Sequence, residues 1–264
     1  MEMKVSNKTF AAKRLKITGI IVLLALIYLV CSLILNFQTS SFLSVQTGLI
    51  WLAKNFIPNS QSIQYWQDIA YQLFRTFLVA VSSTTVAAGG ALFLAILGAK
   101  NTALNRNASW IIRGFASLLR NIPIVGWAMI LLFSFKQNDF TGFLALFFLS
   151  LGFLTRAFME TIEDFGSEKI QGLQATGANY LQVVFQAVLP EVATALISWI
   201  LYMIENNIRD ATLVGLLTGT GIGFLFDLYF KSLRYGAAGL VVTAIIILVV
   251  AIELVSNYIE RCIQ

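Results

Sequence analysis

The sequence predicts an all-α, polytopic membrane protein with about six transmembrane helices, and two observations support this fold class. Of the 264 residues, 58% are hydrophobic and only 12% are charged, which is about half the charged fraction of a typical soluble domain. The apolar residues also gather in runs of about 20, the length that crosses the hydrocarbon core of a bilayer. Such runs leave no room for a soluble catalytic domain.

Six predicted spans follow one another along the chain. The first follows a basic tail and lacks a small-residue cleavage site behind it, so we expect a retained helix rather than a signal peptide. The third is interrupted by Arg120, Asn121 and Pro123, and the fifth ends at a polar cluster, residues 205–210. The spans cover residues 17–35, 69–97, 110–135, 140–159, 190–210 and 236–255.

These spans and their connections predict three parts. Residues 1–69 form a tail, the first span and an external segment, residues 70–260 form the core, and residues 261–264 form a short tail. The longest polar connection of the core includes residues 166–190 and separates the fourth span from the fifth. Residues 211–230 form a short segment between polar residues, which leaves a re-entrant loop open as an alternative to a span.

Basic residues predict the orientation, because they favour the cytoplasmic side of a membrane protein. A cytoplasmic amino terminus and an even number of spans place both termini in the cytoplasm. The ten basic residues then inside are Lys4, Lys8, Lys13, Arg14, Lys16, Lys100, Arg106, Arg113, Lys169 and Arg261. The four outside are Lys54, Lys136, Lys231 and Arg234. The same bias explains the net charge of +5, which therefore does not indicate nucleic-acid binding.

The composition argues against an enzyme. The chain has no histidine, the commonest general base and metal ligand. Its two cysteines, Cys31 and Cys262, lie near opposite ends without CxxC partners. The sequence also lacks the Gly-x-Ser-x-Gly and HExxH patterns of hydrolases and metalloproteases. We therefore predict no catalytic residue, cofactor or metal site in this chain.

The 166–190 loop carries the first motif. Gly177 allows a sharp turn without a side-chain penalty, and Pro190 suits the first turn of the following helix. We expect Leu173 and residues 183–185 to supply apolar side chains that insert into a partner. An ordinary amphipathic loop is the plainer alternative.

The spacing of Gly177, Leu189 and Pro190 resembles the EAA loop of binding-protein-dependent ABC importer permeases. That resemblance implies two short helices with a turn at the glycine, the first docking in a groove of an ATPase subunit. Gln171 and Gly172 depart from the family's Glu-Ala pair, and a neutral amide cannot form an ion pair with the ATPase. The candidate coupling residues are Gln171, Gly172, Leu173, Ala175, Gly177, Ala178, Leu189 and Pro190.

A second, narrower resemblance covers residues 70–260. The run Leu201-Tyr-Met-Ile-Glu-Asn-Asn-Ile-Arg-Asp-Ala-Thr212 and the glycines after it resemble the phosphonate-type permease family. Thr218 and Thr220 depart from that family, because they replace small residues of its glycine run. The resemblance implies a type I ABC importer permease fold. The pathway or gating candidates are Glu205, Asn207, Arg209, Thr212, Gly215, Gly221 and Gly223.

Glu205 and Arg209 are spaced for a helical ion pair, with the acid nearer the amino end. Charges within a span usually face a bundle interior or a water-filled path. The pair could be a buried clamp that fixes the helix, or Arg209 could make the pathway tolerant of an anion, since guanidinium suits phosphorus oxyanions. Both roles can coexist. The other intramembrane charges are Arg75 and Arg156, which could assist Arg209, and Glu160.

These observations together predict a non-catalytic permease subunit of an ABC importer for phosphonates or related phosphorus oxyanions, in the cytoplasmic (inner) membrane of a prokaryote. The resemblance implies two ABC ATPase subunits that bind ATP and Mg, an extracytoplasmic phosphonate-binding protein, and a second permease copy or a paralogue, all in contact with membrane lipid. A permease for methionine or another oxyanion remains an alternative. An ion-coupled secondary transporter is a further one, although no inverted repeat is evident.

Overall fold

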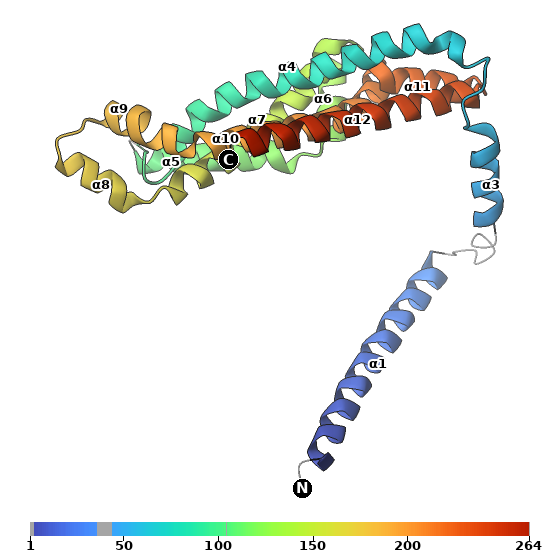
Figure 1. The fold of residues 1–264 in the computed structure, drawn as a ribbon, viewed down its shortest axis with the longest axis horizontal. Helices are drawn as coiled ribbons and strands as arrows, with labels where there is room; N and C mark the ends of the chain where they lie inside the picture. Colours follow the sequence, from blue (N-terminus) through green and yellow to red (C-terminus); the bar gives the residue numbers. More distant parts are fainter. Residues whose placement is uncertain (1–2, 36–43, 104, 264) are drawn as a thin grey trace. The chain divides into compact units, whose positions relative to one another are not determined.

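The computed structural model describes residues 3–35, 44–103 and 105–263, and within these ranges every regular element is a helix (Figure 1). The predicted all-α class is confirmed. The chain divides into two units, Met1–Lys54 and Asn55–Gln264.

The first unit contains α1 (Met3–Ile34) and α3 (Val45–Asn55). Residues Lys13–Ile34 of α1 are long and apolar enough to cross a membrane, in agreement with the first predicted span. The large apolar side chains from Leu15 to Ile34 are exposed. Since lipid can solvate such side chains, an isolated apolar helix is stable in a bilayer, where all its backbone hydrogen bonds are internal.

The second unit is a bundle centred on three helices. Its core consists of α4 (Trp66–Gly98), α7 (Asp139–Asp164) and α10 (Leu189–Thr218), which pack against one another. Figure 1 shows α8 and α9 at one end of this unit and α11 near the other. The remaining elements are the 3₁₀ turn Ile63–Tyr65, α5 (Arg106–Asn121), α6 (Ile124–Phe135), α8 (Ser167–Ala175), α9 (Tyr180–Gln182), the π-helix η2 (Val183–Val188), α11 (Gly221–Lys231) and α12 (Tyr235–Ile263).

Helices α4 and α7 pack closely because α4 buries small side chains along its length. The stripe comprises Thr76, Ala80, Thr84, Ala87, Ala91, Ala95 and Gly98. Small residues let helix backbones approach in lipid, where the hydrophobic effect does not drive helix association. A side chain added at Gly90 would contact Leu151, and one added at Gly98 would overlap Met159. The two helices therefore run in the same direction.

Because α4 and α7 are parallel, the chain between them must return along the bundle, and α5 and α6 make this return. The hydroxyl of Ser109 donates to the carbonyl of Gly98 at 2.5 Å, and the Phe135 ring contacts that of Phe140 at a centroid distance of 5.6 Å. The pair thus begins beside the end of α4 and finishes beside the start of α7. It bends by 91° before α6, at the Pro123 interruption that the sequence predicts.

The described part of the chain has five helices that could cross a membrane, or six if the bent α5–α6 pair counts as one span. The fifth span continues to Thr218, so the prediction that it ends at residues 205–210 is wrong. The side chains of Glu205, Asn206 and Arg209 bond within α10, that of Asn207 bonds to neighbouring helices, and the backbone need not break. At 11 residues α11 is about 16 Å long, too short to cross the bilayer core.

One buried amide joins the three central helices. Asn207 of α10 has no exposed surface, and its side-chain nitrogen donates to Thr84 Oγ1 of α4 at 2.7 Å and to Ser150 Oγ of α7 at 2.6 Å. Side-chain hydrogen bonds between membrane helices stabilise their association by about 0.6–2 kcal/mol each. The amide therefore fixes which face of α10 meets the other two helices.

We predict that Asn207→Leu, a change to a side chain of similar size, lowers the thermal unfolding temperature of the purified protein in detergent. The free energy of unfolding should fall by about 1–2 kcal/mol, because both bridging hydrogen bonds disappear. Asn206→Leu is the matched control, since the Asn206 amide bonds only within α10, to the carbonyl of Tyr202. Equal unfolding temperatures for the two variants would contradict the bridging role.

Candidate functional site

The 166–190 loop turns at Gly177, as the sequence predicts. The N–H of Ala178 donates to the carbonyl of Leu173 at 3.3 Å, and the N–H of Gly177 donates to Gln174 at 3.0 Å. This is the Schellman pattern that ends a helix with a left-handed residue, and Gly177 has a φ of +91°. Leu173 and Ala178 both pack against the core. The turn thereby holds the end of α8 against the bundle.

The second arm of the loop starts at Asn179 and continues into α10. The side chains and backbones of Asn179 and Gln182 form a reciprocal capping box at the start of α9. The π-helix η2 follows and leads directly to Pro190 in the first turn of α10. Pro190 lies in the first turn of α10, as the sequence predicts. The wider π turn lies where the proline ring removes one helical hydrogen bond.

The exposed residues of the loop differ in part from those expected. Val183 and Val184 are buried in the core and cannot insert into a partner, because the π turn directs them inward. Leu181 and Phe185 are the large apolar side chains that this arm exposes. A groove of about 470 Å³ separates the arms of the loop, lined by residues that include Leu173, Gln182 and Gln186. Of the candidate residues, Leu173, Ala178 and Leu189 are half-buried; Gln171, Gly172, Ala175, Gly177 and Pro190 are exposed.

Glu205 and Arg209 form the ion pair that their spacing predicts. The pair is not buried in this chain, which corrects the expectation of a buried clamp, because 47% of the Arg209 side chain and 20% of the Glu205 side chain are exposed. The buried position of Asn207 explains why the Glu205–Arg209 pair is exposed rather than buried. Residues of an α-helix lie about 100° apart, so positions two residues before and after Asn207 point to the opposite face.

The outward face of α10 is otherwise apolar. Trp199, Tyr202, Leu213 and Leu216 are exposed, and they share the helical spacing of Glu205 and Arg209. The ion pair therefore lies in an apolar stripe that the other helices of the second unit leave at least partly exposed. We refer to these six residues as the α10 stripe.

The glycines of the candidate pathway bring α10 and α11 into backbone contact. A side chain at Gly215 would overlap the carbonyl of Thr220, and one at Gly223 would overlap the carbonyl of Thr212. Gly221 has a φ of +65°, and the next N–H, that of Ile222, donates to Thr76 Oγ1 at 2.9 Å. Thr76 thereby attaches the start of α11 to α4. The structure gives these glycines a packing role.

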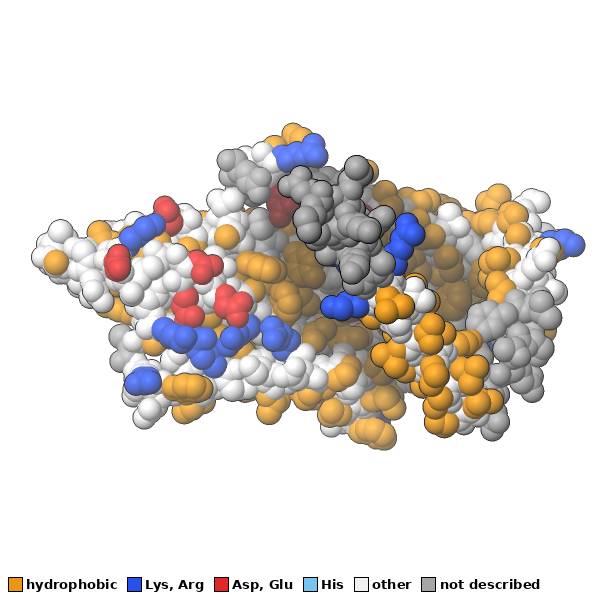
Figure 2. Space-filling model, turned by 90° about the horizontal axis from the view of Figure 1, so that it is seen from below, with side chains coloured by type: hydrophobic (Ala, Val, Ile, Leu, Met, Phe, Trp, Pro, Cys, Tyr) orange, Lys and Arg blue, Asp and Glu red, His pale blue; other side chains and the backbone are white. Residues whose placement is uncertain are grey.

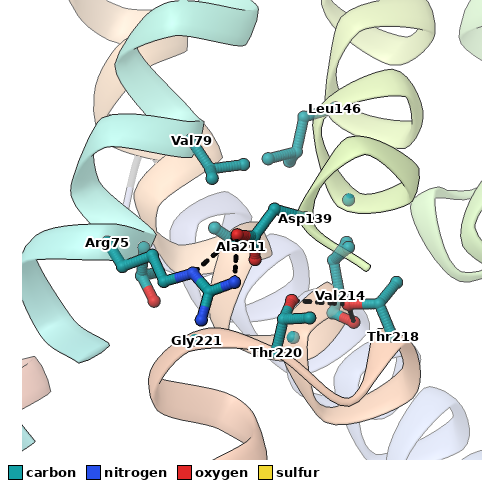
Figure 3. Close-up of a pocket in the computed structure, with 12 residues that line it drawn as sticks. Arg75, Val79, Asp139, Leu146, Ala211, Val214, Thr218, Thr220 and Gly221 are labelled. Carbon is teal, nitrogen blue, oxygen red and sulfur yellow. Dashed lines mark hydrogen bonds and ion pairs between the residues drawn. The ribbon is translucent and has the colours of Figure 1, made fainter. Parts of the chain in front are cut away.

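A small cavity lies where α4, α7, α10 and α11 meet (Figure 3). The guanidinium of Arg75 on α4 pairs with Asp139, the first residue of α7, and Thr218 and Thr220 bond to each other beside them. Its volume is about 20 Å³, which is room for about one water molecule. This cavity cannot hold a phosphorus oxyanion in the described conformation.

The three arginines proposed to act together lie apart. Arg156 pairs with Glu160 one turn further along α7, and Arg156 is 17 residues beyond Asp139, the partner of Arg75. At 1.5 Å per residue that separation is about 25 Å. Arg75 and Arg156 thus belong to opposite ends of the bundle and cannot jointly assist Arg209, since each already has its own carboxylate partner.

Charged side chains of both signs gather near the end of the molecule formed by α8 and α9 (Figure 2). At the end of α7 that leads into α8, a contact that the sequence did not predict joins Arg113 of α5 and Glu163 of α7. The sequence gives no signal for it, because the two residues are 50 positions apart. Among the described residues, no group of three His, Cys, Asp or Glu side chains could hold a metal ion.

The family model described as "Binding-protein-dependent transport system inner membrane component" matches residues 90–264. The chain belongs to this family. The expected family membership is therefore confirmed, and the match includes the 166–190 loop and the α10 stripe.

Two relatives illustrate the range of similarity. The phosphate-import permease protein PhnE of Mycolicibacterium smegmatis is 25% identical over 193 residues, which is 73% of this chain and 36% of that protein. The phosphite transport system permease protein PtxC of Stutzerimonas stutzeri is 26% identical over 189 residues, 72% of this chain and 69% of that protein. The chain thus spans only about a third of the first relative.

Solved structures show the same fold at low sequence identity. A chain of the MetNI methionine ABC transporter, in an inward-facing conformation, has a TM-score of 0.67 and 14% identity, with 78% of this chain and 99% of that chain covered. An amino acid ABC transporter chain has a TM-score of 0.65 and 12% identity, with 75% and 95% covered. The ABC importer permease fold that the sequence resemblance implies is confirmed.

We predict that Gly177→Ala loosens the loop while Gly172→Ala does not. An L-residue costs about 1–2 kcal/mol in the left-handed conformation, so amide hydrogens of residues 171–182 should exchange roughly 5–30 times faster. Gly172 is helical with open space around its Cα, and alanine there should leave exchange equal or slower. Unchanged exchange in Gly177→Ala would show that the loop does not need this turn.

Proposed function

We propose that this chain is the transmembrane permease subunit of an ATP-driven ABC importer for phosphonates or related phosphorus oxyanions, such as phosphite and phosphate esters. Its family and the names of its relatives, which include phosphate and phosphite permeases, support the substrate class. Two separate ATPase subunits would hydrolyse ATP, and an extracytoplasmic binding protein would deliver the substrate. The permease itself carries out no chemistry.

The observation that carries this proposal is the charged pair in the α10 stripe. An ion pair exposed to lipid is costly, and charges within membrane spans therefore face protein or water. Within the second unit, 47% of the Arg209 side chain and 20% of the Glu205 side chain stay exposed, so a second copy or a paralogue would complete the surface and enclose an aqueous path. Arg209 would make that path tolerant of an oxyanion, since its planar donors match two oxygens.

The 166–190 loop would transmit the movement of the ATPase subunits to the membrane helices. Its exposed candidates, Gln171, Gly172 and Ala175, lie on α8, and the turn at Gly177 fixes this helix against the core. Docking of α8 on an ATPase subunit would move the entire α7–α10 hairpin, because both arms of the loop continue into central helices. The neutral Gln171 would dock through hydrogen bonds rather than an ion pair.

This assignment includes an orientation and a division of the chain. The loop and both termini would lie in the cytoplasm, and the membrane would be the inner membrane of a prokaryote. Residues 1–69 would provide the tail, the first span and an external segment, residues 70–260 the permease core, and residues 261–264 the terminal tail. The basic side chains near α8 and α9 support the cytoplasmic placement of that end.

The substrate class is tested by reconstituting the chain in vesicles with the ATPase and the binding protein encoded beside its gene. We expect ATP-dependent uptake of a phosphonate or phosphite. Uptake of methionine in place of every phosphorus oxyanion would overturn the assignment and favour the alternative importer class. Uptake that needs an ion gradient but no ATP would favour a secondary transporter.

The role of the ion pair is tested by Glu205→Gln combined with Arg209→Met, which removes both charges and leaves neither unpaired. We expect an assembled complex that hydrolyses ATP while phosphonate uptake falls about tenfold, which corresponds to ~1.4 kcal/mol. Asp227→Asn with Lys231→Met is the matched control, because that pair has the same spacing on α11. Normal uptake by the first double variant would show that Arg209 only fixes the helix.

A further inference from the structure

The end of α7 that leads into the 166–190 loop is fixed to two other helices by one carboxylate. Glu163 Oε1 pairs with the guanidinium of Arg113 on α5 and accepts the backbone N–H of Lys100, just after α4, at 2.6 Å. Only 14% of the Arg113 side chain and 22% of the Glu163 side chain are exposed. Of the six ion pairs in the described part of the chain, this one is the most buried.

Further hydrogen bonds converge on the same junction. The Asn101 amide donates to the carbonyl of Ile162 at 2.8 Å, and Arg113 also donates to the carbonyl of Gly98 at 3.3 Å. The hydroxyl of Ser109 bonds to that same carbonyl. The end of α4, the start of α5 and the end of α7 therefore form a single hydrogen-bonded block, in which Glu163 is the charged link.

This block lies directly before α8. Gly166, with a φ of +89°, makes the turn between α7 and α8 three residues after Glu163. A force on α8 reaches the end of α7 first, and the Glu163 carboxylate then joins α7 to α4 and α5. Without that link, α7 could move against its neighbours, because the remaining contacts here are the single Asn101–Ile162 hydrogen bond and apolar side chains such as Met159 and Ile112 against Gly98.

We propose that Glu163 is a positioning residue for transport: it makes α4 and α5 move together with α8 when the ATPase subunits move that helix. The proposal rests on the proposed function only in requiring that an ATPase docks on α8. It concerns a residue outside the glycine and Leu-Pro motif of the loop. It also explains why an acidic side chain near the cytoplasmic end of α7 is mostly shielded from solvent.

The matched comparison is Glu163→Gln against Glu160→Gln. Glu160 lies one turn earlier on the same helix, its side chain is 58% exposed, and it pairs only within α7, with Arg156 at 2.7 Å. Glutamine at position 163 can still accept the Lys100 N–H but loses the charge that holds Arg113. A third variant, Glu163→Gln with Arg113→Met, leaves no unpaired charge and separates loss of the link from loss of folding.

Two readouts are measured in the complex with ATPase subunits. The first is substrate transported per ATP hydrolysed, which we expect to fall about fivefold or more in Glu163→Gln and in the double variant, the lower end of typical coupling effects. ATP hydrolysis and thermal stability of the double variant should stay near those of the unsubstituted complex. Glu160→Gln should transport normally.

The second readout does not depend on the substrate. Spin labels at the exposed Gln174 on α8 and at the exposed Ile111 on α5 report whether the two helices move together, once Cys31 and Cys262 are replaced. Their separation should stay constant on ATP binding in the unsubstituted complex and in Glu160→Gln, and should change in Glu163→Gln. A failure of phosphonate uptake in the unsubstituted complex would contradict the proposed function without affecting this distance measurement.

The proposal is overturned if Glu163→Gln matches Glu160→Gln in both readouts. It is also overturned if the double variant recovers full transport per ATP, because the ion pair would then only stabilise the fold. A separation between the labels that changes on ATP binding even in the unsubstituted complex would likewise contradict it, since α5 would not follow α8.

Discussion

The orientation of α10 about its own axis depends on the Asn207 amide, and much of the structure follows from that orientation. Because Asn207 bonds to α4 and α7 at once, Ala211, Val214 and Thr218, which share its face, are buried with it. Residues on the opposite face, Glu205 and Arg209 among them, must then point away from the bundle. A single polar contact therefore determines which residues remain for a partner or a pathway.

Directional polar contacts also hold the two ends of α7. Its middle packs against small side chains of α4, which fix distance but not sliding along the axis. Ion pairs supply that restraint, with Asp139 bound to Arg75 at one end and Glu163 bound to Arg113 at the other. Between these ends, Ser150 meets Asn207. The bundle thus combines a weakly directional apolar contact with three directional polar ones.

The sequence predicts what depends on neighbouring residues along the chain. Long apolar runs indicate the helices, Pro123 indicates the break between α5 and α6, and Gly177 indicates the turn of the loop. Spacing alone also predicts the Glu205–Arg209 pair. These features follow from backbone geometry and from side chains one helical turn apart, so no tertiary information is needed.

The sequence does not predict contacts between distant segments. Asn207 and Arg209 look equivalent in a run of polar residues, and only the position of Thr84 and Ser150 makes one inward and the other outward. The Arg113–Glu163 pair joins residues 50 positions apart. The continuation of α10 past residue 210 has in part the same origin, because Asn207, one of the polar side chains that otherwise suggest a helix end, is satisfied by tertiary hydrogen bonds.

The central claim is that the α10 stripe faces water or a second copy rather than lipid, and cysteine accessibility in the assembled complex tests it most directly. Single cysteines at Leu213 and at Ile246, an exposed residue of α12, are compared after Cys31 and Cys262 are replaced. A small, water-soluble thiol reagent should modify the cysteine at position 213 and not the one at 246, and a second copy bearing the same change should allow disulfide cross-linking near the stripe. If position 213 is as unreactive as 246 and forms no cross-link, the stripe faces lipid and the account is contradicted.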